Sequence, residues 1–286
     1  MTRAARSSVG LLVFVAVAVL SPVLARSRPW LVDAGGRAVV PAPIPHDPDA
    51  VNLDERFESP GAAHWLGTDE LGRDVLARLV HGARVSVGAG LLACGVALLF
   101  GATLGATAGL VGGRAERAIL FVVEIVQAFP ALVLVAAAAA FLPPSFLVAA
   151  LLIGLTGWTD AARLVRAEAR RLRTAAFVEA SRASGAPRSR LLLVHVLPHA
   201  LPPALATAPY VLGAAVLTES ALSFLGLGTP PPASSWGRAL ADAREVLTTA
   251  PWCVVPPALA LLLLVLSARR LGDALLPAPR SRMPLT

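Results

Sequence analysis

The sequence predicts an all-α membrane protein with about six transmembrane helices. Of its 286 residues, 56% are hydrophobic and 15% are charged, and the mean hydropathy is +0.70. A soluble domain carries more charge and less apolar content than this. Lipid is therefore the better solvent for the chain, and we expect apolar helices of about 20 residues, the length that crosses a hydrocarbon core.

Six apolar segments are long enough to be considered, and they cover residues 9–24, 85–110, 118–142, 146–165, 201–225 and 252–271. The first segment is short and follows Arg3 and Arg6. We interpret residues 1–25 as an N-terminal transmembrane helix. A signal peptide is the alternative, since Val23 and Ala25 suit a cleavage site.

The distribution of arginine predicts the orientation. Residues 163–190 hold eight Arg against two acidic residues, whereas residues 26–84 hold seven Arg against nine. Because cytoplasmic loops carry the excess of positive charge, we place both termini in the cytoplasm. The expected organisation is an extracytoplasmic segment 26–83, a five-helix core 84–275 and a cytoplasmic tail 276–286, in a multi-pass protein of the plasma (inner) membrane.

Glycine and proline predict how the spans pack and bend. Gly101, Gly105 and Gly109 repeat every four residues and form one stripe on a helix, where another backbone can approach closely. Packing within the chain is the preferred interpretation, and a contact with another subunit is the alternative. Pro130 and the pair at 256–257 should bend or interrupt their helices.

The external segment shows no sustained periodicity over residues 29–60, which are rich in Pro, Asp and Gly, and it should be irregular. Apolar residues then recur at helical spacing over 71–80. This pattern predicts an amphipathic helix in the membrane interface, capped by Thr68 or Asp69.

The most informative polar region is the cytoplasmic loop at residues 166–200. Good helix formers over 174–184 precede Gly185, a natural C-cap, and Pro187 suits the first turn of a second helix. That second helix should stop at Pro198 or pass there into the next span. A structured loop of this kind suggests docking of another protein, and a self-packed loop is the alternative.

Few ionisable or amide side chains lie inside the apolar segments. Glu124 and Gln127 fall in the third segment and Glu219 in the fifth. Such groups are costly in a bilayer, so each should line an aqueous path or pair structurally. We expect Asp160 near the cytoplasmic end of the fourth span, paired locally with Arg163.

Three motifs in the chain carry a resemblance. The cytoplasmic loop fits the pattern E-A-A-x3-G-x9-I-x-L-P through Glu179, Ala180, Gly185, Leu197 and Pro198. Ser181 replaces the second Ala of this pattern, and His195 replaces the Ile. Residues 64–74 fit H-x-L-G-T-D-x-x-G-R-D, and residues 219–228 fit E-x-x-L-S-F-L-G-L-G.

The first pattern resembles the EAA loop of ABC-importer permeases, and the other two resemble segments of the dipeptide, oligopeptide and nickel permeases. The likeness covers roughly residues 60–275, and the arrangement is similar to that of the second ("C") permease of these systems. We identify no such resemblance for residues 25–60.

The resemblance implies a type I ABC-importer permease fold. It also implies that the chain forms half of a translocation pore for di- or oligopeptides, or for nickel or another small solute. The implied partners are a second permease in a heterodimer, two ATP-binding subunits, an extracytoplasmic substrate-binding protein and membrane lipid. Residues 179–185 would then form the coupling helix, which docks on an ATPase.

The residues exclude several other classes of function. A Walker A loop needs a Lys, and this chain has none. ATP hydrolysis must therefore come from the partners, and we predict no catalytic residue, cofactor or metal in this subunit. An intramembrane hydrolase would need an H-E-x-x-H or G-x-S-x-G motif. A secondary transporter often shows an internal repeat, which is absent here. The arginines lie between apolar segments, so nucleic-acid binding is not expected.

Overall fold

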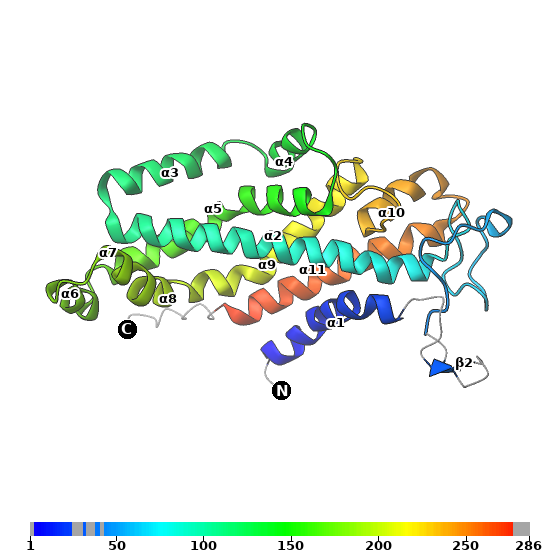
Figure 1. The fold of residues 1–286 in the computed structure, drawn as a ribbon, viewed down its shortest axis with the longest axis horizontal. Helices are drawn as coiled ribbons and strands as arrows, with labels where there is room; N and C mark the ends of the chain where they lie inside the picture. The colour runs from blue at the N-terminus through cyan, green and yellow to red at the C-terminus, as the bar shows by residue number, and fades with distance from the viewer. Residues whose placement is uncertain (1–2, 25–30, 33–37, 41–42, 277–286) are drawn as a thin grey trace, which may run out of the picture.

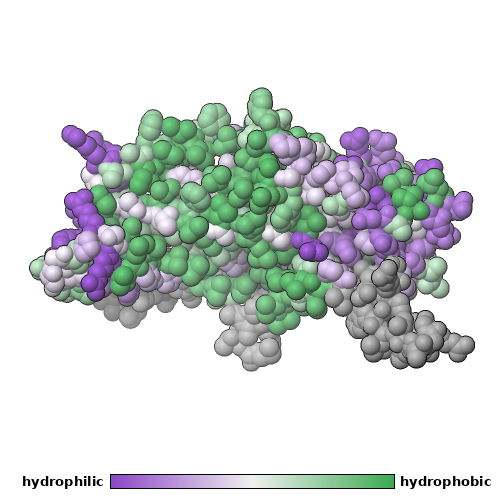
Figure 2. Space-filling view, viewed as in Figure 1, coloured by the Kyte–Doolittle hydropathy of each residue, from purple (hydrophilic) through white to green (hydrophobic). Residues whose placement is uncertain are grey.

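The computed structural model describes residues 3–24, 31–32, 38–40 and 43–276 of the chain. It is an elongated bundle of helices that run side by side along its length (Figure 1). Apolar residues cover its middle, and polar residues gather at both ends (Figure 2). We name these two ends the α6 end and the α10 end, after the helices that lie there.

The elements follow one another in a simple order. The longer helices are α1 (Arg3–Leu24), α2 (Val75–Val111), α3 (Gly113–Gln127), α4 (Ala131–Ala139), α5 (Phe146–Leu172), α9 (Pro202–Phe224) and α11 (Val255–Leu275). The shorter ones are α6 (Ala176–Ala183), α7 (Arg188–Arg190), α8 (Leu197–Ala200) and α10 (Trp236–Ala243). A π-helix, η2 (Leu191–Val196), and 3₁₀ turns η1 (Leu53–Glu55), η3 (Arg244–Val246) and η4 (Pro251–Cys253) complete the helical elements. Strands β1 (Leu31–Val32) and β2 (Ala38–Val40) pair antiparallel in the segment expected to be irregular.

The predicted all-α membrane fold is confirmed. Within the described residues, four helical stretches are long and apolar enough to cross a bilayer: α2, α5, α9 and Pro251–Leu275. Helices α3 and α4 together pass the same test as a pair bent by 84°. Helix α1 contains a shorter apolar stretch, Val9–Pro22. These elements correspond to the six predicted apolar segments.

The glycine stripe on α2 packs against α5 within the chain. A Cβ added to Gly101 would lie 2.6 Å from the Cβ of Ala161, and one added to Gly105 would lie 2.4 Å from the carbonyl oxygen of Ala162. Such distances are possible only because glycine has no side chain. The preferred interpretation, packing within the chain, is confirmed.

Helix α1 is an integral part of the bundle and lies along α11 (Figure 1). A Cβ at Gly10 would meet Oγ of Ser267 at 2.6 Å, so the two helices approach closely. Ala18 is buried in a cluster with Val87 and Leu264, and the ring of Phe14 meets that of Trp236 edge-on at 5.9 Å.

The prolines act differently at their two positions. The predicted interruption at Pro130 is confirmed, because α3 ends before it and α4 begins after it. The predicted kink at 256–257 is wrong. Those prolines occupy the first turn of α11, where their missing N–H groups would have no helical partner in any case.

The helix predicted over 71–80 is not a separate element. Helix α2 begins at Val75 and runs unbroken for 37 residues, across the expected domain boundary at 83–84. Its first turns are buried, with Ala77 and Ala83 almost fully covered. The cap is Asp74, which accepts a hydrogen bond from the Ala77 N–H, rather than Thr68 or Asp69. Among the residues that carry the apolar periodicity, Val75 is buried, and Leu76, Leu79 and Val80 are partly buried against the rest of the protein.

Candidate functional site

Helix α6 lies at the tip of the bundle, beyond the ends of its longest helices (Figure 1). Helix α5 carries the chain there because it extends to Leu172, seven residues beyond the predicted end of its span at 165. Val178 of α6 is fully buried in a cluster with Leu191 and Val196. Glu179 and Ala180 are exposed beside it. One face of α6 is therefore fixed to the bundle, and the other is free to contact a partner.

A tight turn follows α6 at the glycine predicted to cap it. Gly185 has φ +82°, a conformation that favours glycine. Its N–H bonds to the Arg182 carbonyl at 3.0 Å, and the Ala186 N–H bonds to the Ser181 carbonyl at 3.1 Å. This pair of bonds is the Schellman motif, which satisfies the last carbonyls of the helix. The turn sends the chain directly back toward the bundle.

Two outcomes were predicted at Pro198: that the second helix stops there, or that it passes there into the next span. The structure shows the second outcome. The chain remains helical through α7, η2 and α8 and passes into α9. The π-helix explains how, since the Leu197 N–H bonds to the Leu192 carbonyl five residues back. A regular helix would place the Pro198 ring against the carbonyl four residues earlier, and the wider turn relieves that clash.

The two departures from the loop pattern are in contact with each other. Oγ of Ser181 lies 3.2 Å from Nε2 of His195, a hydrogen bond that joins α6 to the π-helix. The Phe177 ring lies 5.3 Å from that of His199 beside it. Sequence reasoning missed this pair. The contact could have been predicted, because Ser181 and His195 both place a hydrogen-bonding side chain where the pattern has an apolar one.

A cavity of about 760 Å³ lies among the helices of the bundle. Residues of α2, α5 and α9 line it, together with residues around the break between α3 and α4. Most of these are small or aliphatic. The polar lining residues are Gln127, Thr156, Thr159, Asp160, Thr207, Tyr210 and Thr218.

The structure separates the three polar residues predicted inside the spans. Gln127 lines the cavity, and its Nε2 donates to Oγ1 of Thr159 and Oδ1 of Asp160, both at 3.1 Å. Glu124 is exposed and is not among the lining residues. The expected pairing of Asp160 with Arg163 is wrong, because Asp160 lies in the middle of α5 and faces Gln127. Sequence reasoning could not place it, since the end of α5 was underestimated.

Glu219 lies near the α10 end of α9 and is 1% exposed. Its Oε1 accepts a hydrogen bond from Oγ of Ser223 at 2.7 Å. Ser220 and Ser223 flank it on the same helix and are themselves buried. This environment corresponds to structural pairing, the second of the two predicted roles.

Residues 64–74 fold over the α10 end of the bundle, and we call this segment the cap. Asp69 holds the turn through Oδ1, which accepts the N–H of Leu71 and of Arg73. Gly72 has φ +68°, and a Cβ there would lie 1.7 Å from the Asn52 carbonyl oxygen, so only glycine fits. Arg78 of α2 lies 3.5 Å from Asp69 and so joins the cap to the bundle.

Comparison with known proteins gives consistent matches. Residues 101–281 match the family described as "Binding-protein-dependent transport system inner membrane component". The chain is 39% identical to the dipeptide transport system permease protein DppC of Alkalihalophilus pseudofirmus, over 78% of this chain and 74% of that one. It is 38% identical to the nickel transport system permease protein NikC of Escherichia coli, over 81% of this chain and 84% of that one.

A solved structure shares the fold. An inward-facing structure of the MetNI methionine ABC transporter aligns with a TM-score of 0.54 at 18% identity, over 71% of this chain and 98% of that chain. At this identity the likeness concerns the fold alone. The predicted type I importer permease fold is confirmed.

Proposed function

The chain belongs to the family of binding-protein-dependent transport system inner membrane components, in its peptide and nickel permease branch, and on that premise we propose that it forms half of the pore of an ATP-driven importer for di- or oligopeptides. The observation that carries this proposal is α6. It is a short helix at the tip of the bundle, fixed on one face and exposed on the other.

The attachment of α6 suits the transmission of force. It is joined to α5 by a short link and to α9 by the Gly185 turn and the continuous helical run after it. A push on the exposed face around Glu179 and Ala180 would therefore move both helices together. These two helices also line the cavity, so docking of an ATPase at the α6 end would change the shape of the transport path.

The cavity supports a peptide as the substrate. It is large and mostly apolar, with a few hydroxyl and amide groups, as binding sites for organic solutes usually are. Of the described residues that line it, none is His or Cys, the side chains that best hold a nickel ion. Nickel remains the alternative because NikC is nearly as similar to this chain as DppC.

The assembly that we propose contains a second permease, two ATP-binding subunits and an extracytoplasmic substrate-binding protein. The second permease would complete the pore beside the cavity that α2, α5 and α9 line. The α6 end would face the cytoplasm together with both termini, because the arginine-rich loop lies there. The chain has no Lys for a Walker A loop, so ATP hydrolysis would occur only in the partners.

Site-directed crosslinking tests the docking surface. In the assembled importer, a photoreactive probe on Ala180→Cys should capture an ATP-binding subunit, because this residue is exposed on α6. The same probe on Ala62→Cys, exposed at the α10 end, is the matched control and should not. Both native cysteines are buried and are replaced by serine beforehand. Equal capture from both positions, or capture of lipid alone, contradicts the docking.

Uptake by the complete importer in proteoliposomes tests the substrate. We expect ATP-dependent accumulation of a labelled dipeptide or oligopeptide when the binding protein is added. Accumulation of Ni²⁺ without peptide uptake would select the nickel alternative. Uptake that continues in the absence of ATP and of the ATP-binding subunits would contradict an ABC-importer role altogether.

A further inference from the structure

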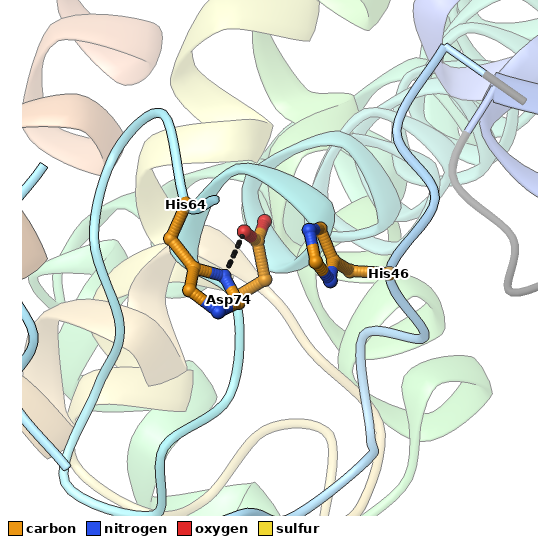
Figure 3. Close-up of side chains that lie close together, drawn as sticks. All are labelled: His46, His64 and Asp74. Carbon is orange, nitrogen blue, oxygen red and sulfur yellow. Dashed lines mark hydrogen bonds and ion pairs between the residues drawn. The ribbon is translucent and has the colours of Figure 1, made fainter. Parts of the chain in front are cut away.

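Three metal-binding side chains converge at the α10 end, from separate parts of the chain (Figure 3). His46 precedes η1, His64 lies in the cap, and Asp74 is the residue before α2. One ligand-type atom from each lies within 4.8 Å of the others. His64 and Asp74 are buried, whereas His46 is partly exposed. An ion from the solvent could therefore reach the group past His46.

The carboxylate of Asp74 and the buried imidazole of His64 each contact a further residue of the protein that fixes their orientation. Oδ1 of Asp74 accepts the Ala77 N–H at 2.7 Å, which leaves Oδ2 to face Nδ1 of His64 at 2.8 Å. Nε2 of His64 lies 3.3 Å from a carboxylate oxygen of Glu55. Outer contacts of this kind, above all a carboxylate behind a ligating histidine, orient the ligands of protein-bound metals.

His46 is fixed in the same way. Its Nε2 lies 3.0 Å from the carbonyl oxygen of Ala63, and a carbonyl can only accept a hydrogen bond. Nε2 therefore carries the proton in the neutral ring, and Nδ1 keeps its lone pair. Figure 3 shows the ring of His46 beside the carboxylate of Asp74. Each of the three ligands thus has a partner that sets its orientation or tautomer.

We propose that His46, His64 and Asp74 bind a divalent first-row transition-metal ion of the Zn²⁺ class, which clamps the segment before η1 to the start of α2. Two imidazoles and one carboxylate are a donor set that such ions favour. With bonds of about 2.0–2.2 Å, ligand atoms lie roughly 3–3.5 Å apart, so only small movements are needed. The ion takes the place of the proton between His64 and Asp74, and that proton passes to water.

This ion is a resident of the protein rather than its cargo. None of the three residues lines the large cavity among the residues described there. Without the ion, His64 lies between two carboxylates, with Nδ1 2.8 Å from Oδ2 of Asp74 and Nε2 3.3 Å from a carboxylate oxygen of Glu55. The inference therefore does not depend on which substrate is transported.

Metal titration of the full-length chain in detergent tests the site. After treatment with a chelator, we expect the wild type to bind one equivalent of Zn²⁺ by calorimetry and to melt at a higher temperature with the ion. His46→Gln should weaken Zn²⁺ binding about 10- to 100-fold, the loss typical of disturbing a metal site. It should also abolish the thermal shift. The matched control is His199→Gln, which changes an exposed histidine at the α6 end and should bind as the wild type does.

His46 is the better position for this test because His64→Gln would also disturb Asp74, which caps α2. Co²⁺ bound to the wild type gives a second measurement that needs no variant, and its visible spectrum should indicate nitrogen ligands. The proposal is overturned by the absence of saturable Zn²⁺ binding or of such a Co²⁺ spectrum. It is also overturned by equal affinity in the wild type and His46→Gln, or by equal losses in His46→Gln and His199→Gln.

Discussion

A methyl group at Gly105 would test the contact between α2 and α5 directly. The Cβ of Gly105→Ala would lie 2.4 Å from the carbonyl oxygen of Ala162 and 3.0 Å from its Cα. Carbon–oxygen contacts normally lie at about 3.3–3.6 Å, so the helices must separate locally by about 1 Å. The obstacle is backbone, which cannot rotate out of the way as a side chain could.

The expected loss of stability follows from two opposing effects. Overpacking a close-packed interior costs about 1–3 kcal/mol. Replacing glycine by alanine within a helix stabilises the helix by up to about 1 kcal/mol. Because the clash is with backbone, we take the upper part of the first range and expect a net loss of about 1–2 kcal/mol. For a chain of this size that corresponds to a fall of roughly 2–3 °C in melting temperature.

Gly95 on the same helix supplies the matched control. A Cβ there meets nothing within 4 Å, so Gly95→Ala should keep or raise the melting temperature through helix propensity alone. Both variants would be purified in the same detergent and compared by fluorescence-detected size-exclusion thermostability. If Gly105→Ala melts at or above Gly95→Ala, the close packing of α2 on α5 is refuted as a source of stability.

Three further variants probe the turn, the cavity and the cap. Gly185→Val forces a β-branched residue to φ +82°, at about 1–2 kcal/mol, so uptake should fall. Gly185→Asn, which accepts this conformation, should transport; equal uptake by the two excludes a role for the turn. Gln127→Ala loses two hydrogen bonds to α5, worth about 0.5–1.5 kcal/mol each. Backbone amides near the α3–α4 break should therefore exchange hydrogen for deuterium faster. Unchanged exchange would contradict a stabilising contact between Gln127 and α5. The Cβ of Gly72→Ala would clash with the Asn52 carbonyl oxygen, whereas the Cβ of the control Gly113→Ala, at a similar φ of +62°, would meet nothing within 4 Å. Only Gly72→Ala should abolish folded protein in the membrane.

Much of the architecture could be predicted from the sequence. Hydropathy located every long membrane helix, because a span must be apolar over its whole length. The chemistry of single residues marked the break at Pro130 and the turn at Gly185. Both signals are local, so neither needs knowledge of the neighbouring helices.

Some local signals were misleading. The prolines at 256–257 predicted a bend or an interruption but lie in the first turn of α11. The apolar periodicity after the cap predicted an interfacial helix but belongs to the buried start of α2. In each case the same residue pattern fits two environments, and its surroundings select one of them.

The sequence by itself determined that the chain crosses a membrane repeatedly, that residues 179–198 fit the pattern of a permease loop, and that the chain has no Walker A lysine. Only the tertiary structure decided that Gln127 meets Asp160, that Ser181 bonds to His195, and that His46 joins His64 and Asp74. The physical reason is one of range. Apolarity and backbone preference act over a few residues, whereas side-chain contacts depend on the register and angle at which distant segments pack.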